Sequence, residues 1–186
     1  PREHLYTNAV RPYERAPHLL LGFPTRFLPP KQQTEPTFMV SRDGITFHRY
    51  PDAVVPTTAP KDRDGNRSNY MTSGLLKLPG KPDELSVYAT EAYYAGPAGR
   101  VRRFCYRVDG FVAAEVGEKG GELLTRPLQY QGNNLVLNYA TTAAGKVRVA
   151  LEDPDGKLLA EGRELQGDAT ARVVTWAAGT GLNNWT

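Results

Sequence analysis

Three features of the amino-acid sequence predict an all-β fold. The 186 residues include 18 Gly and 15 Pro and few long apolar runs, which is typical of many short strands joined by turns. Residues 73–108 contain three consecutive strand patterns separated by turns, the unit from which propeller blades are built. After the Asp109-Gly110 turn, short alternating strands follow one another as in a sandwich. We therefore predict a partial β-propeller meander over residues 1–108 and a jelly-roll-like β-sandwich region over residues 109–186.

The charge and the motif content exclude several classes of function. The formal net charge is +3, and Lys and Arg interleave with Asp and Glu, which predicts a mixed solvated surface and no nucleic-acid partner. No apolar stretch is long enough for a membrane span, so no membrane partner is expected. The sequence has no Walker loop, dinucleotide fingerprint or nucleophile elbow, and therefore predicts no cofactor.

The sequence offers little support for metal or thiol chemistry. His4 and His48 have no acidic neighbour at metal-ligand spacing, so no metal site is predicted. Cys105 is the single cysteine and cannot form an internal disulfide. Its place in an alternating strand predicts a buried, inert thiol.

The first elements are short and punctuated by proline. Residues 1–17 are predicted to be coil, and no helix fits there because the prolines after Arg11 and Ala16 keep their predecessors extended. The apolar run at residues 19–23 predicts the first strand, and residues 29–36 are expected to form a loop. A second strand is predicted at residues 37–41.

The turn after the second strand has a distinct chemistry. Asp43-Gly44 separates two apolar segments, and this pair favours a hairpin because Gly tolerates positive φ and Asp can accept hydrogen bonds from the nearby backbone. The surrounding SRDGITF resembles the Asp-box-like hairpins of sialidases and other β-propellers, where the motif is structural. We therefore interpret Asp43 as a turn residue rather than a catalytic one.

The middle of the chain contains a long polar loop and the predicted meander. The loop at residues 51–70 lacks periodicity, and it is either the rim of a site for a polar ligand or solvated surface. Strands are predicted at residues 73–78, 85–91 and 100–108. In the last of these, alternation places residues 101, 103, 105 and 107 on one face and residues 102, 104, 106 and 108 on the other.

The second region reads as strands separated by Gly, Asn and Asp turns. Asp153-Pro154-Asp155-Gly156 has the composition of a type I turn, with Pro at its second position and Gly at its fourth. Strands are predicted at residues 123–124, 128–130, 135–139, 146–151, 158–159 and 172–176.

Several strings, in order, carry a family resemblance over nearly the whole chain: HLYTNAVRPY, APHLLLGFPTRF, SRDGITFHR, RVRRFCYRVDGFV, GGELLTRPL, LVLNYATTAAGKVRV and GDATARVVTW. They are similar to the C-terminal portion of a bacterial glycoside-hydrolase-like family related to the invertase and arabinanase five-bladed β-propellers, with a β-sandwich behind the propeller. The resemblance implies further blades upstream and a few strands downstream, so the chain is expected to be a fragment or a shortened relative. It also implies export, to the periplasm or outside the cell.

The resemblance implies an activity as well. Glycosidases of this architecture use two carboxyl groups that face each other across the sugar. In the resembled propellers, the nucleophile or base and a transition-state-stabilising Asp lie on blades upstream of Pro1. The chain is therefore expected to be incomplete as an O-glycosyl hydrolase.

Two carboxylates are the catalytic candidates. Glu14 lies in YERAPH, which is similar to the E-[GA]-P-H string around the proton donor of arabinanase-like propellers, with Arg15 as an extra residue. Such a shift by one residue turns a strand side chain to the opposite face. Glu91 lies at a strand end among tyrosines, a composition that suits a sugar site. The alternative for Glu91 is a salt bridge with Arg100, Arg102 or Arg103.

The candidate substrate-binding residues combine aromatic and polar side chains: His18, Arg67, Asn69, Tyr70, Tyr88, Tyr93 and Tyr94. Two functions remain open. The first is a carbohydrate-active enzyme of which this chain carries the later part. The second is a non-catalytic carbohydrate-binding or assembly module, in which the tyrosines, Trp176 and Trp185 would be binding platforms or core residues. The expected partner in both is an oligo- or polysaccharide, and uncovered sheet edges predict self-association or a partner chain.

Overall fold

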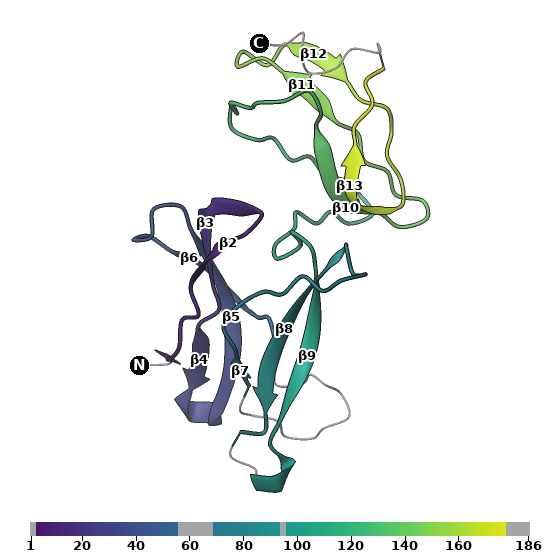
Figure 1. Cartoon of the computed structure of the whole chain (residues 1–186). Coiled ribbons are helices and arrows are strands. Elements are labelled where there is room, and N and C mark those ends of the chain that lie inside the picture. Colours follow the sequence, from purple (N-terminus) through teal and green to yellow (C-terminus); the bar gives the residue numbers. More distant parts are fainter. Residues whose placement is uncertain (1–2, 56–68, 94–95, 178–186) are drawn as a thin grey trace. The chain divides into compact units, whose positions relative to one another are not determined.

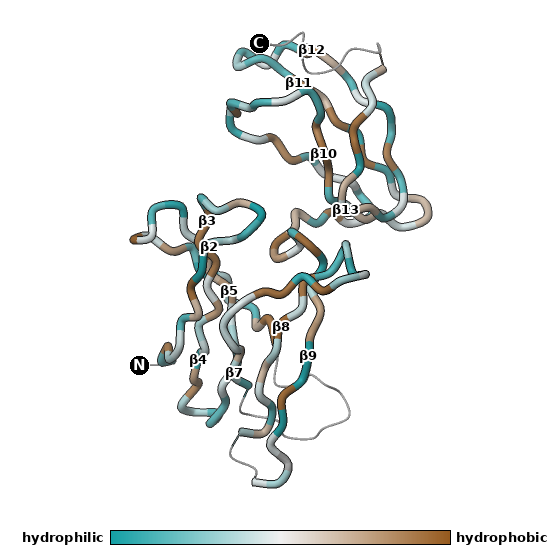
Figure 2. The backbone as a smooth tube through the Cα atoms, viewed as in Figure 1, coloured by the Kyte–Doolittle hydropathy of each residue, from teal (hydrophilic) through white to brown (hydrophobic). Residues whose placement is uncertain are grey.

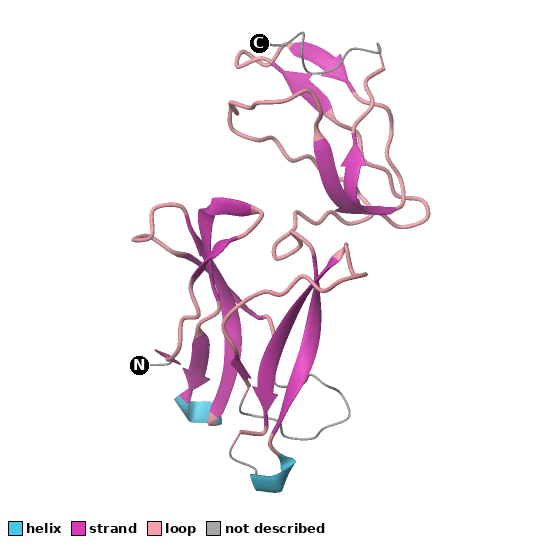
Figure 3. Cartoon of the chain, in the orientation of Figure 1, coloured by secondary structure: helices cyan, strands magenta, loops and turns pink. Residues whose placement is uncertain are grey.

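A computed structural model describes residues 3–55, 69–93 and 96–177 of the chain (Figure 1). The predicted all-β class is confirmed: the described elements are antiparallel strands and two short 3-10 turns, and none of the sheets closes into a barrel (Figure 3). The chain divides into two compact units, unit 1 (Pro1–Tyr106) and unit 2 (Arg107–Thr186). Among the described helices, none has the length and apolar character that a membrane crossing requires.

Unit 1 contains a six-stranded antiparallel sheet. Its strands are β1 (His4–Leu5), β2 (Arg11–Tyr13), β3 (Ala16–Gly22), β4 (Thr25–Leu28), β5 (Gln33–Ser41) and β6 (His48–Ala53). β3 and β4 run along β5 in one unbroken register, from Leu20 opposite Ser41 to Leu28 opposite Gln33. Pro24 separates them because it has no N–H to donate, although its carbonyl accepts the Thr37 N–H at 2.9 Å.

Two loop predictions for this sheet are wrong. Residues 1–17 are not all coil, because β1 and β2 form there. Pro12 is tolerated in β2 because this strand lies at an edge of the sheet. Residues 29–36 are not all loop either: the 3-10 turn η1 (Pro29–Lys31) and the left-handed Gln32, at φ 50°, reverse the chain so that β5 begins at Gln33.

The predicted hairpin at Asp43-Gly44 is confirmed, since β5 and β6 pair as antiparallel neighbours from Val40 opposite His48. Asp43 Oδ1 accepts the backbone N–H groups of Ile45 at 2.9 Å and Thr46 at 2.8 Å. Gly44 takes a positive φ of 74°. The two backbone N–H groups lower the pKa of Asp43 to about 2, because they stabilise its ionised form.

A second sheet of unit 1 consists of β7 (Tyr70–Met71), β8 (Glu84–Glu91) and β9 (Arg100–Arg107). One face of β8 is buried along Leu85, Val87, Ala89 and Glu91. The predicted strand at residues 73–78 is wrong in extent, because only Leu76 forms a ladder pair, with Ser86.

The alternation predicted along β9 agrees with its burial pattern, in which residues 102, 104 and 106 are less exposed than residues 101, 103 and 105. Cys105 lies on the exposed side of this strand. The prediction of a buried thiol is therefore wrong: the residue is in the strand that was expected, but it faces solvent rather than the interior.

Unit 2 contains two antiparallel strand pairs: β10 (Val136–Ala140) with β13 (Asp168–Val173), and β11 (Ala150–Glu152) with β12 (Leu158–Glu161). Hydrophobic residues recur along β10 (Figure 2). The core of the unit is formed by Leu165, Val174 and Trp176, against which residues of β10, β11 and β12 pack. Trp176 is therefore a core residue.

Turn chemistry was predicted better than strand extent in unit 2. The turn at residues 153–156 is confirmed by the Gly156 N–H, which donates to the Asp153 carbonyl at 2.9 Å. The strands predicted at residues 123–124 and 128–130 are absent from the described structure. Leu123, Leu124 and Leu128 are exposed there. Short apolar stretches alone therefore did not form strands in the absence of a neighbouring strand.

Candidate functional site

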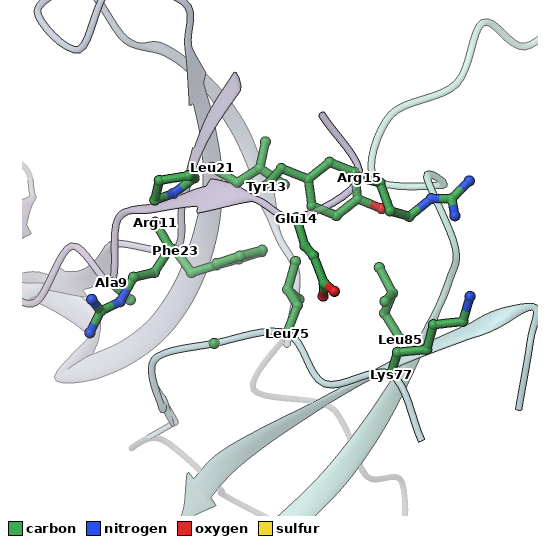
Figure 4. Close-up of a pocket in the computed structure, with 12 residues that line it drawn as sticks. Ala9, Arg11, Tyr13, Glu14, Arg15, Leu21, Phe23, Leu75, Lys77 and Leu85 are labelled. Carbon is green, nitrogen blue, oxygen red and sulfur yellow. The ribbon is translucent and has the colours of Figure 1, made fainter. Parts of the chain in front are cut away.

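Unit 1 contains a pocket of about 340 Å³ beside β2 and β3 (Figure 4). Its walls come from these two strands, from the segment at residues 74–77 and from the start of β8. The residues that line it are Ala9, Arg11, Pro12, Tyr13, Glu14, Arg15, Leu21, Phe23, Gly74, Leu75, Lys77 and Leu85.

The β2–β3 hairpin presents Glu14 to this pocket. Tyr13 pairs with Ala16, which leaves Glu14 and Arg15 as the two turn residues, and the register shifts between Pro12 and Tyr13. The Glu14 side chain extends from this turn between Leu75 on one side and Lys77 and Leu85 on the other (Figure 4). The tight turn therefore aims a carboxylate at the segment that follows β7.

Three of the polar side chains that line the pocket have groups available for binding. Within the part of the chain that the structure describes, Glu14 and Lys77 make no hydrogen bond or ion pair. Arg11 donates through Nε to Ser73 Oγ at 3.1 Å, and its terminal nitrogens have no partner among the described residues. The pocket thus offers one strong acceptor and several strong donors.

The floor of the pocket is apolar and partly aromatic. Tyr13, Leu21, Phe23 and Leu85 are all buried. Their burial fixes the backbone of β2, β3 and β8 beneath the polar rim, because these side chains belong to the core of unit 1. A pocket with an apolar floor and a few polar groups at its rim is the usual form of a small-molecule site.

The second catalytic candidate, Glu91, lies elsewhere. Its side chain is fully buried, with Oε2 3.1 Å from Arg100 Nε and Oε1 2.9 Å from Arg102 Nε. The salt bridge that the sequence left as the alternative is therefore present with two of the three arginines. Arg103 instead donates to Ser86 Oγ at 2.9 Å. Among the described lining residues, Glu14 is the one carboxylate.

The structure does not bring the candidate binding residues together in the pocket. His18 lies exposed on β3 and is not among the described residues that line the pocket. Asn69 is fully buried and its Nδ2 donates to the Val55 carbonyl at 3.4 Å, which is a structural role.

Of the described candidate tyrosines, Tyr70 lies on β7, Tyr88 lies on β8 and Tyr93 follows the end of β8. Tyr70 and Tyr93 form a tilted pair with ring centroids 5.4 Å apart, and Tyr93 is more than half exposed. Tyr88 is half-buried on β8. Arg67, Tyr94 and Trp185 lie outside the described residues.

Sequence reasoning missed Arg11, Leu75 and Lys77. They lie in segments separated by more than 60 residues, and the folded sheets bring these segments to one pocket. Glu14 was predicted as a candidate from the local sequence around it. No local pattern marks Lys77, so it could not be predicted in the same way. For metal chemistry, the described residues contain no group of three or more His, Cys, Asp or Glu side chains placed to hold an ion.

No family model, characterised protein or solved structure shows significant similarity to the chain. The glycoside-hydrolase-like resemblance therefore stays a prediction. The described residues form an all-β fold, and unit 1 contains a pocket of about 340 Å³.

Proposed function

We propose that the chain binds carbohydrate in the Glu14 pocket and does not hydrolyse it unaided. The observation that supports this proposal most is the unpartnered Glu14 carboxylate inside a pocket that also carries unpartnered donors. Sugar hydroxyls donate and accept hydrogen bonds, so a carboxylate together with Lys77 and Arg11 complements them. The buried ring of Phe23 contributes to the apolar floor beneath these polar groups.

The arrangement of carboxylates favours binding over catalysis. Both mechanisms of glycoside hydrolysis need two carboxyl groups roughly 5 to 9.5 Å apart across the scissile bond. Glu14 is the one carboxylate among the described lining residues, and Glu91 is held between two arginines. Hydrolysis would therefore need a second carboxylate from outside the described lining of the pocket.

The finer fold forms part of the same proposal. In the β7–β9 sheet, successive strands are neighbours, which is the connectivity of propeller blades. In the six-stranded sheet, β2–β3, β4–β5 and β5–β6 pair in sequence order, whereas β1–β4 and β3–β5 do not. The Asp43 hairpin joins two such neighbours, as its Asp-box-like sequence suggests. We take unit 1 as part of a β-propeller and unit 2 as a β-sandwich-like module.

A glycan array probed with the 186-residue chain tests the binding. Glu14→Ala removes the acceptor from an exposed turn and should weaken binding roughly tenfold or more, as expected for a charge-assisted hydrogen bond. Glu115→Ala is the matched control, because Glu115 is an exposed carboxylate of unit 2. Binding by neither wild type nor control, or binding that Glu14→Ala leaves unchanged, would contradict the proposal.

A chromogenic-glycoside screen on the same proteins tests the absence of unaided hydrolysis. We expect no release of chromophore by the wild-type chain. Release that Glu14→Ala abolishes would show that the chain is a complete enzyme, and the binding-only proposal would then be wrong.

A further inference from the structure

The charge of the Glu14 pocket narrows the class of carbohydrate. We infer that its ligand is an anionic carbohydrate, one that carries carboxylate or sulfate groups among its hydroxyls. This inference rests on the proposed function and adds the charge of the ligand to it.

Cations outnumber anions in the pocket. Arg11, Arg15 and Lys77 line it with one carboxylate, Glu14. The whole chain is far closer to balance, with 23 Lys and Arg against 20 Asp and Glu. Elsewhere in unit 1, several arginines lie in ion pairs with glutamates, as Arg26 does with Glu35 and Arg102 does with Glu91. Arg11 and Lys77 differ from those arginines, because neither forms an ion pair with a described residue.

Two of these cations keep their charged groups open to a ligand. Lys77 has no ion pair or hydrogen bond with any residue that the structure describes, and Arg11 uses only Nε, toward Ser73. Glu14 lies in the same pocket but does not pair with either of them within the 4.0 Å limit of a salt bridge. An anionic group of the ligand would gain charge-assisted hydrogen bonds here without breaking any existing pair.

The positions of the charges suggest how such a ligand would lie. In Figure 4, the Arg11 guanidinium extends at one end of the pocket, the Arg15 and Lys77 side chains extend at the other, and the Glu14 carboxylate lies between them. An acidic oligosaccharide suits this order, since its anionic groups would face the cations while its hydroxyls donate to Glu14. A neutral sugar would offer no anionic group to Arg11 or Lys77.

The test compares ligands that differ only in charge. Binding of the 186-residue chain to tri-galacturonate is measured by calorimetry beside its fully methyl-esterified form, with a sulfated trisaccharide and an uncharged galactotriose as further arms. The acidic glycans should bind at least roughly tenfold more tightly than their uncharged counterparts. Added salt should weaken the binding of the acidic glycans and leave that of the uncharged glycans unchanged. Tri-galacturonate and the sulfated sugar then distinguish a carboxylate ligand from a sulfate ester.

Lys77→Gln assigns the effect to the pocket. This variant should weaken the affinity for the preferred acidic glycan roughly fivefold, which is the effect expected from loss of a solvent-accessible ion pair. The affinity for an uncharged glycan should change less than roughly twofold. Lys31→Gln is the control, because Lys31 is exposed on η1 and does not line the pocket. Equal effects of the two variants would overturn the inference, since the attraction would then come from net charge alone.

The glycan array separates the two possible failures. If the glycans bound there are all neutral and their binding depends on Glu14, the proposed function stands and the inference about charge is wrong. If no glycan of either kind is bound, the proposed function itself fails. Selective binding of acidic glycans that is lost on Lys77→Gln supports both.

Discussion

Arg102 and Glu91 form an ion pair in unit 1, with Arg102 Nε 2.9 Å from Glu91 Oε1. Arg100 Nε lies 3.1 Å from the other carboxylate oxygen, and the Glu91 side chain has no solvent exposure. The two carboxylate oxygens thus each face a different arginine of β9, and the buried side chain is not presented to the solvent. Glu91 is therefore a structural residue that joins the end of β8 to the beginning of β9.

Replacing Glu91 should reduce stability. In Glu91→Gln the two arginines lose their counter-charge, although both are partly exposed and can regain water. We expect the free energy of unfolding in urea to fall by about 2 kcal/mol. Glu14→Gln is the control and should change it by less than about 0.5 kcal/mol, because Glu14 is exposed. Unchanged stability together with lost carbohydrate binding in Glu91→Gln would show that Glu91 serves the site.

The Asp43 turn should make stability depend on pH in the acid range. Its pKa is about 2 in the folded chain against an ordinary value of 3.8, so the ionised carboxylate stabilises the hairpin. This contribution is present above about pH 4 and is lost as the pH falls toward 2. The gap in urea midpoint between wild type and Asp43→Ala should therefore narrow over that range. A gap that is constant with pH would contradict the assignment.

Tyr106 should ionise at a higher pH than an ordinary tyrosine. Its hydroxyl donates to the Val54 carbonyl, and burial raises the pKa of the phenol to about 12. In an ultraviolet titration, Tyr106→Phe should remove absorbance that appears only near pH 12. The same variant leaves the Val54 carbonyl without this donor and should cost about 1 to 2 kcal/mol of unfolding free energy. Loss of absorbance near pH 10 instead would mean that the phenol is solvated.

Trp176 should be essential to unit 2. It is 6% exposed and belongs to the core cluster with Leu165 and Val174. Trp176→Ala should cost about 3 to 5 kcal/mol, since a large buried ring is deleted. Hydrogen exchange followed by mass spectrometry should then show loss of protection in β10 and β13. Protection of these strands at the wild-type level would show that the core lies elsewhere.

Local chemistry in the sequence was the reliable guide to the fold. Asp43-Gly44 and Asp153-Gly156 predicted their turns because the side chains and the glycines satisfy the turn backbone by themselves. The alternation of buried and exposed side chains along β9 could be predicted for a similar reason, because it depends only on the two-residue period of a strand.

Features that depend on contacts between residues far apart in the sequence could not be predicted from local patterns. The prolines of residues 1–17 excluded a helix and the segment was predicted to be coil, but β2 forms there because Pro12 lies at a sheet edge where its missing donor matters little. Leu123 and Leu124 suggested a strand, yet no neighbour pairs with them among the described residues. The candidate site follows the same rule: Glu14 was found from a local string, whereas Lys77 joined it only through the packing of two sheets.

The most direct test of carbohydrate binding in the Glu14 pocket is a ¹H–¹⁵N NMR titration of the 186-residue chain with the glycan that binds best on the array. The pocket predicts shifts concentrated in residues 9–15 and 74–77, which line it from opposite sides. Glu14→Ala should remove these shifts at the same glycan concentration. Shifts confined to Tyr70 and Tyr93, or none at all, would contradict the assignment of the site to this pocket.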